Sequence, residues 1–410
     1  MMKHKIVKKK SIHTFFCLAI LLLYGCSSDD ETSPIENEIG SEMESEMENE
    51  MESEIVPPAG TISFTINNSA INRETILNLA NGDFIDEEEV PGPISIEEHQ
   101  DHTYLFRGNS LVKQDGNGNL VWEKTYPENN IVPFEIFNSN VVFEGETVYF
   151  SYSRLDTVTF ERTHFLECIS LIDGGTLWIK NVNGETFPSL VNGRLLTLTY
   201  PNGNSPVNFA YLDKETGSTN FEKTYEERID PDNLAIDGDN ILVSSWGDRV
   251  FALNTMLDEE WTFGTDAENV RRGIVAQNQL IFPSRDRNIY ALNKDTGALN
   301  WQSLLEGRSS QGFHIHNEML YVIQKNGDKV ILYKIDNEDG NIESRTELQI
   351  ANSENSVLAA FFQDYMVLVN PINDVSTAVS LTYLPNAEQL WQIDSERVGT
   401  RNTEIEIQLN

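Results

Sequence analysis

The feature that most constrains the fold of this chain is a repeated unit that ends in a tryptophan. The clearest copy is IYALNKDTGALNW, residues 289–301, in which apolar residues alternate on both sides of a polar turn. More divergent copies end at Trp122, Trp178, Phe221, Trp261 and Trp391, and the weakest ends at Ser344. We call these six end positions and Trp301 the seven anchors. Their spacing is 40 to 47 residues, apart from a first step of 56, which is typical of repeat architectures.

Each unit has the pattern of a β-hairpin. Five units carry a glycine four residues before the anchor, at a turn position that favours positive φ: Gly118, Gly174, Gly217, Gly297 and Gly340. Another apolar or alternating run precedes every hairpin but the first, and a shorter run precedes several of these. Four short strands per repeat are typical of a propeller blade, and helical periodicity is lacking. We therefore predict an all-β fold, a seven-bladed β-propeller of four-stranded blades.

Two segments do not match the repeat. Residues 59–94 contain an alternating run at 61–67 and an ambiguous stretch at 71–86, and the C-terminal residues 403–409 alternate as a strand. One or both could add strands that cover an exposed blade or latch the ring, and the sequence leaves this choice open. We assign 59–94 to extra strands or irregular structure, and 95–410 to the propeller with a C-terminal latch strand.

The N-terminus has the pattern of an export signal. Five lysines lie among residues 3–10, and an apolar run follows at 15–24, which is shorter than the roughly 20 residues that cross a bilayer. The run ends in LLYGC, residues 22–26, which resembles the lipobox of bacterial lipoproteins. This resemblance implies that 1–25 is a lipoprotein signal peptide and that acylated Cys26 anchors the protein to a membrane. An ordinary signal peptide with an unrelated cysteine is the alternative.

The segment after Cys26 is strongly acidic. Residues 26–56 hold twelve acids and no base, so we predict a disordered, extended linker over 26–58. Its start, Asp29-Asp30-Glu31, resembles the acidic export signal of surface lipoproteins in some Gram-negative lineages. The resemblance implies an outer-membrane lipoprotein, with the cell surface favoured over the periplasmic face.

The composition excludes several classes of function. Lys and Arg total 29 and Asp and Glu total 65, a net charge of -36. Without the five leader lysines and the twelve linker acids, the body still has a charge of -29. Such a charge repels nucleic acids and anionic lipid surfaces, so we expect no nucleic-acid partner. Only Cys168 of the three cysteines lies in the body, which excludes a disulfide framework and a cysteine-ligated zinc site.

The hairpin at 291–301 resembles the repeat of pyrroloquinoline-quinone-type propellers, and the resemblance extends over roughly 95–394. It implies that each anchor, from Trp122 to Trp391, packs against the neighbouring blade. Together with the lipobox, it makes the chain similar in architecture to the propeller lipoproteins of the outer-membrane β-barrel assembly machinery. This likeness implies a non-enzymatic scaffold that binds a protein partner. A surface module that binds a glycan or another ligand is the alternative, and a polysaccharide lyase or hydrolase is less favoured.

Catalytic and cofactor motifs are not evident in the sequence. A quinone-dependent dehydrogenase would supply Asp, Glu and Asn ligands for calcium and often a vicinal cysteine pair, which one body cysteine cannot form. Phosphate-binding loops, nucleophile elbows and the zinc motif His-Glu-x-x-His are also lacking. We therefore expect no catalytic residue, no metal site and no cofactor.

Two groups of residues are candidates for binding. Arginines gather in one sector, and we predict that they form a docking patch for an acidic partner: Arg249, Arg271, Arg272, Arg285 and Arg287. Local pairing with Asp248, Asp286 and their neighbours is the alternative. His314 and His316 lie two apart on an expected innermost strand, so both imidazoles should share one side, with the central channel as a candidate direction.

Overall fold

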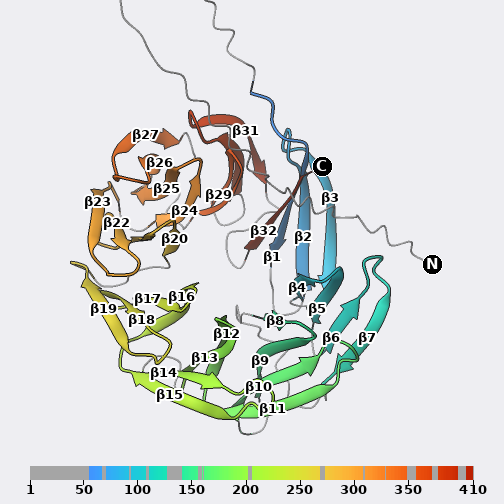
Figure 1. Ribbon diagram of the computed structural model, residues 1–410. Helices are drawn as coiled ribbons and strands as arrows, with labels where there is room; N and C mark the ends of the chain where they lie inside the picture. Colours follow the sequence, from blue (N-terminus) through green and yellow to red (C-terminus); the bar gives the residue numbers. More distant parts are fainter. Residues whose placement is uncertain are drawn as a thin grey trace, which may run out of the picture. The chain divides into compact units, whose positions relative to one another are not determined.

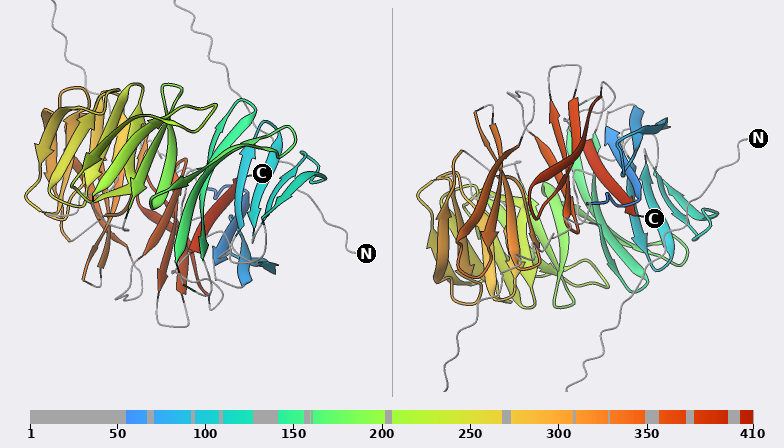
Figure 2. Two further views of the ribbon diagram at one scale, coloured as in Figure 1. Left: turned by 90° about the horizontal axis from the view of Figure 1, so that it is seen from below. Right: turned by 90° about the horizontal axis from the view of Figure 1, so that it is seen from above.

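The computed structural model is all-β in the part of the chain that it describes. That part comprises residues 55–66, 71–91, 94–107, 110–126, 141–155, 159, 161–201, 206–267, 273–307, 310–327, 329–348, 357–371, 377–395 and 403–409. Its strands form eight antiparallel sheets of four strands each. Figure 1 shows these sheets around a common centre, and in Figure 2 the strands run between the two faces of the disc.

Several predictions concern residues outside this part. They are the signal peptide, most of the acidic linker with Cys26, and Arg271 and Arg272. The described residues contain no helix that is long and apolar enough to cross a membrane.

We number the blades in chain order, from the innermost strand outward. Blade 1 contains β4 (Ile94–His99), β5 (His102–Arg107), β6 (Ser110–Gln114) and β7 (Leu120–Thr125). Blade 2 contains β8 (Val142–Glu144), β9 (Thr147–Leu155), β10 (Arg162–Ser170) and β11 (Thr176–Val182). Blade 3 contains β12 (Glu185–Val191), β13 (Arg194–Tyr200), β14 (Val207–Leu212) and β15 (Thr219–Tyr225). Blade 4 contains β16 (Ile229–Asp237), β17 (Asn240–Ser245), β18 (Arg249–Leu253) and β19 (Glu259–Gly264).

The second half repeats this order. Blade 5 contains β20 (Ile274–Ala276), β21 (Gln279–Pro283), β22 (Asn288–Asn293) and β23 (Leu299–Leu304). Blade 6 contains β24 (Ser310–His316), β25 (Met319–Asn326), β26 (Lys329–Asp336) and β27 (Ile342–Leu348). Blade 7 contains β28 (Leu358–Phe362), β29 (Tyr365–Pro371), β30 (Thr377–Tyr383) and β31 (Glu388–Ser395). Blade 8 contains β32 (Thr403–Leu409), β1 (Gly60–Ile66), β2 (Ile71–Asn78) and β3 (Phe84–Pro91).

The prediction of seven blades is wrong, because the two termini build an eighth. The C-terminal strand β32 pairs antiparallel with β1, for example Ile407 opposite Ile62, so both expected terminal additions belong to one sheet. Residues 71–91 form the outer hairpin of this blade. Gly82 lies four residues before Asp86, and Asp86 pairs with Ile76 just before the bulge, as Trp301 pairs with Ala291. The aromatic pattern does not reveal this eighth copy of the repeat, because its anchor is an aspartate.

Core packing follows the position of each strand in its blade. The middle strands are buried on both faces, as β17 and β21 illustrate, whereas the outer strand β19 alternates between exposed and half-buried residues. Buried side chains of adjacent blades therefore pack into shared clusters. One such cluster joins Ile62 and Phe64 of blade 8 to Val367 and Val379 of blade 7. This cluster holds the blade made by the termini against the rest of the fold.

Five anchor tryptophans make the same contact with the next blade. Each indole Nε1 donates to a turn carbonyl: Trp122 to Leu171 (3.1 Å), Trp178 to Lys214 (2.7 Å), Trp261 to Lys294 (3.1 Å), Trp301 to Asn337 (3.2 Å) and Trp391 to Leu79 (2.9 Å). The acceptor lies three residues before the turn glycine. A Cβ atom at Gly217 would lie 2.6 Å from Cε3 of Trp178. The glycine is therefore needed both for its positive φ and for the space that the ring occupies.

The other three turns are shorter and accept no tryptophan. In them the residue with positive φ donates to the carbonyl three residues earlier: Gly118 to Asp115, Leu257 to Asn254 and Ala387 to Leu384. The carbonyl that would accept an indole N–H is thus already bonded. The blades that precede these turns carry Asp86, Phe221 and Ser344 at the anchor. At the blade 3–4 seam, the Tyr225 hydroxyl donates to the Leu257 carbonyl instead, and at the blade 6–7 seam an apolar cluster packs between the sheets.

The double role of the turn glycine can be tested with two matched substitutions. Gly217 and Gly193 have φ values of 68° and 69°, but nothing lies within 4 Å of a Cβ at Gly193. Gly217→Ala should therefore destabilise the fold by about 1–3 kcal/mol more than Gly193→Ala, the usual cost of overpacking. Denaturant unfolding of both variants measures the difference. Equal losses of stability would show that the glycine serves only the backbone.

Candidate functional site

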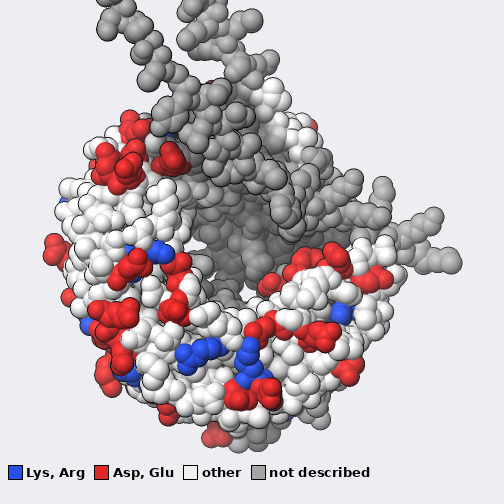
Figure 3. All heavy atoms as spheres, in the orientation of Figure 1, with Lys and Arg blue, Asp and Glu red and all other residues white. Residues whose placement is uncertain are grey.

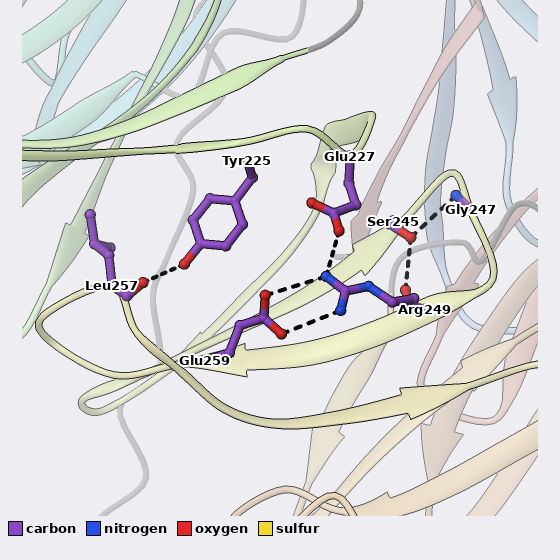
Figure 4. A network of polar contacts seen from close by, with 7 residues as sticks. All are labelled: Tyr225, Glu227, Ser245, Gly247, Arg249, Leu257 and Glu259. Carbon is purple, nitrogen blue, oxygen red and sulfur yellow. Dashed lines mark hydrogen bonds and ion pairs between the residues drawn. The ribbon is translucent and has the colours of Figure 1, made fainter.

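Arg249 does not face solvent as a free docking residue. Its Nη2 lies 2.5 Å from Oε1 of Glu227, and its two Nη atoms each lie 3.3 Å from an oxygen of Glu259. The guanidinium also lies over the ring of Phe251. Figure 4 shows this network, which links the segment before β16 to the outer strand β19. We therefore assign Arg249 to the stability of blade 4, with glutamates as partners in place of the expected aspartate.

The β17–β18 turn, which precedes Arg249, and the β21–β22 turn, which carries Arg285 and Arg287, have equivalent structures. Gly247 donates its N–H to the Ser245 hydroxyl in the β17–β18 turn, as Asp286 does to Ser284 in the β21–β22 turn. Trp246 and Arg285 therefore occupy equivalent positions in the two turns. Likewise, the carbonyl of Asp248 accepts from Thr265 and that of Arg287 accepts from Leu305.

We define the blade 4–5 rim as the outer ends of these turns together with Arg228, which precedes β16 and accepts a hydrogen bond from the Trp246 N–H. The rim residues are Arg228, Trp246, Arg285 and Arg287. Arg228 is exposed and stacks on Trp246, 3.9 Å from the ring centroid. Arg285 and Arg287 are also exposed, and neither forms an ion pair with any residue that the structure describes. Arg287 has a φ of 78°, a left-handed conformation that is unfavourable for a long side chain. Trp246 is the one tryptophan that is not at an anchor position, and in the sequence it could have indicated this surface.

The face of the molecule that Figure 3 draws is mainly acidic. In the orientation of Figure 1, acidic side chains are spread over most of the visible blades, while basic ones form only small groups (Figure 3). The guanidinium groups of arginines can bind carboxylates through two parallel hydrogen bonds.

The two histidines lie on one side of β24, as expected, but they face blade 7. His314 stacks on Phe361 of β28 at 5.3 Å between ring centroids, and His316 follows at 6.0 Å from His314. Nε2 of His316 lies 3.0 Å from Oδ1 of Asp364. Burial, and secondly His316, lower the pKa of His314 below its usual 6.5. Nε2 of His314 is buried and has no hydrogen-bond partner in the described part of the chain.

The depressed pKa of His314 makes the blade 6–7 seam sensitive to acid. The unfolded chain takes up a proton near pH 6.5 while folded His314 does not, so stability should fall as the pH drops below 6.5. His314→Phe keeps a flat ring on Phe361 and removes this titration. We expect the melting temperature of the variant to fall less between pH 7.5 and 5.5 than that of the unmodified protein.

The control for this prediction is His102→Gln, which changes a histidine in the turn between β4 and β5, away from the seam. It should retain the pH dependence of the unmodified protein. A His314→Phe profile that follows the unmodified protein would exclude His314 as the titrating group.

Two further polar groups are buried between blades 1, 2 and 3. Glu167 is 1% exposed and accepts hydrogen bonds from Tyr126 (2.8 Å) and Thr176 (2.5 Å). Burial, followed by the charge of Glu167, raises the pKa of Tyr126. Burial also raises the pKa of the Cys168 thiol to about 12, so the reactive thiolate is scarce at neutral pH. No sequence motif marked this network, whose groups serve packing between blades.

A quinone enzyme of the kind that the repeat resembles would need a set of ligands for calcium. Nowhere in the described ranges do three His, Cys, Asp or Glu side chains gather so that they could hold a metal ion. The calcium that accompanies the quinone in the resembling enzymes would have no such ligand group there, and no reaction step is assigned through it.

Comparison with protein families links the second half of the chain to one family. A model described as "Outer membrane protein assembly factor BamB" matches residues 261–409, which cover blades 5 to 7 and the strand β32. The predicted resemblance of the repeat to quinoprotein-type propellers and to BamB is confirmed by this match. No curated protein sequence matches the chain.

Solved structures show the same fold at low sequence identity. BamB from Moraxella catarrhalis has a TM-score of 0.51 and 13% identity, over 73% of this chain and 87% of that chain. The dihydro-heme d1 dehydrogenase NirN has a TM-score of 0.55 and 11% identity, over 83% and 74%. Apo AztD from Citrobacter koseri has a TM-score of 0.52 and 11% identity, over 85% and 98%. A protein named as an assembly factor and one named as a dehydrogenase share this fold, so the likeness establishes the fold alone.

Proposed function

We propose that this chain is an outer-membrane lipoprotein, anchored through acylated Cys26, that acts as a non-enzymatic scaffold and binds a protein partner. The observation that carries the proposal is the blade 4–5 rim. There Arg285 and Arg287 are exposed and have no ion pair among the described residues. The match of residues 261–409 to an outer-membrane assembly factor supports a role in holding another protein.

The chemistry of the rim favours an acidic protein surface as its partner. Arginine and tryptophan are the residues most often found at the energetic centre of protein interfaces, and Arg228 and Trp246 already stack with each other. Holding Arg287 at a positive φ has a cost in free energy, which is reasonable if the turn must present its side chain. The partner is expected to offer carboxylates to Arg285 and Arg287.

The role of the rim can be tested by removing its two unpaired charges. Arg285→Ala with Arg287→Ala should reduce recovery of the partner after crosslinking in cells by about tenfold, which corresponds to about 1.4 kcal/mol. The melting temperature should stay unchanged, because neither side chain packs in the core. Quantitative mass spectrometry of the crosslinked material measures the recovery.

A matched control removes two positive charges elsewhere. Arg345→Ala with Lys329→Ala changes the net charge equally but affects exposed ion pairs of blade 6 with Glu306 and Glu347. Such pairs contribute little to stability. Partner recovery should persist in this control. Equal recovery from both double variants would remove the rim from the proposal.

The anchoring and surface display form a separate part of the proposal. They are supported by the lipobox-like LLYGC and by Asp29-Asp30-Glu31 behind it. Protease added to whole cells should degrade the propeller while periplasmic marker proteins stay intact. Cys26→Ser should release the chain from the membrane fraction. Protection of the protein in intact cells would place it on the periplasmic face, and membrane retention of Cys26→Ser would argue against the lipid anchor.

A further inference from the structure

A cavity of about 740 Å³ lies between the innermost strands of four consecutive blades. Its described lining comes from β12, β16, β20 and β24 of blades 3 to 6. Figure 1 shows these four strands on the inner side of their blades, facing the centre. Most of the lining residues lie two to five positions before the turns that lead to the second strand of each blade. The cavity is therefore near the end of the channel opposite to the blade 4–5 rim.

The lining is uncharged and mainly apolar in the part that the structure describes. Its side chains are Leu234, Ala235, Ile236, Ile274, Val275 and Phe313, with the hydroxyl of Ser189 as the polar exception. Gly273 and Gly312 add backbone without side chains. On a body with a net charge of -29, such a wall is unlike the general surface.

Two of the lining side chains are not used by the core. Leu234, Val275 and Phe313 pack against hydrophobic clusters between blades. Ile236 and Ile274 belong to none of the clusters among the described residues, and Ile236 is 37% exposed although it lies on an innermost strand. Large, partly exposed apolar side chains that line a cavity are a recurrent feature of ligand sites.

We propose that this cavity binds a small, uncharged and mainly apolar molecule. Its volume lies within the range of roughly 300–1,000 Å³ that is typical of small-molecule sites. Without a ligand it would hold roughly 25 water molecules at about 30 Å³ each, and most of them would face apolar walls. An apolar ligand would release this water. The lining offers no counter-charge to an anion, and the acidic body further disfavours one.

Binding can be tested with N-phenyl-1-naphthylamine, a neutral apolar fluorophore of suitable size. The chain from residue 26 onward carries Cys26→Ser in every sample, so that no acyl chain competes for the probe. Saturable fluorescence enhancement with one site per chain is the expected result. Ile274→Trp, which places a bulkier side chain in the cavity wall, should weaken the affinity at least about tenfold.

The matched control is Ile172→Trp, which places the same residue in an exposed turn on the outer side of blade 2. It should bind the probe as the unmodified chain does. Non-saturable binding, or equal affinity of Ile274→Trp and the unmodified chain, overturns the proposal. Native mass spectrometry of the full-length protein, expressed with its leader and Cys26 and purified from the envelope, is a second readout. A retained species of a few hundred daltons, lost in Ile274→Trp, supports the proposal, and a retained polypeptide overturns it.

Discussion

The structure depends on one repeated contact, in which an indole ring packs against a turn glycine of the next blade. The ring buries apolar area, its N–H reaches a carbonyl that the five-residue turn leaves free, and the glycine leaves room for it. Each of the three parts requires the others. Where the turn is one residue shorter, the carbonyl is bonded within the turn and the anchor is not tryptophan. Turn length and anchor type are thus two aspects of the same geometry.

This dependence explains why the blades are not joined equally. Five seams have the tryptophan contact, while the seam between blades 3 and 4 relies on Phe221 and Tyr225. The seam between blades 6 and 7 combines an apolar cluster with the stacked His314 and Phe361. Among the described buried residues, no cluster joins blade 8 to blade 1. The eight seams therefore differ in the chemistry of their contacts.

The two candidate binding regions use opposite ends of the propeller. The blade 4–5 rim is built from turns between the second and third strands, whereas the cavity lies toward the turns after the innermost strands. The rim is polar and arginine-bearing, and the cavity is apolar. A protein partner at one end and a small ligand in the channel would thus not compete for the same residues.

The sequence by itself determined the all-β class, the four-stranded period and six of the aromatic anchors, because these depend on local alternation and turn chemistry. The number of blades was decided by tertiary structure, since the eighth sheet pairs β32 with β1 across the whole chain and carries Asp86 where an aromatic residue was sought. The arginine sector was only partly predictable. Composition located it, but whether an arginine is free depends on glutamates brought close by folding, as Glu227 and Glu259 are to Arg249. The cavity could not be predicted at all, because its wall combines single strands from four different repeats.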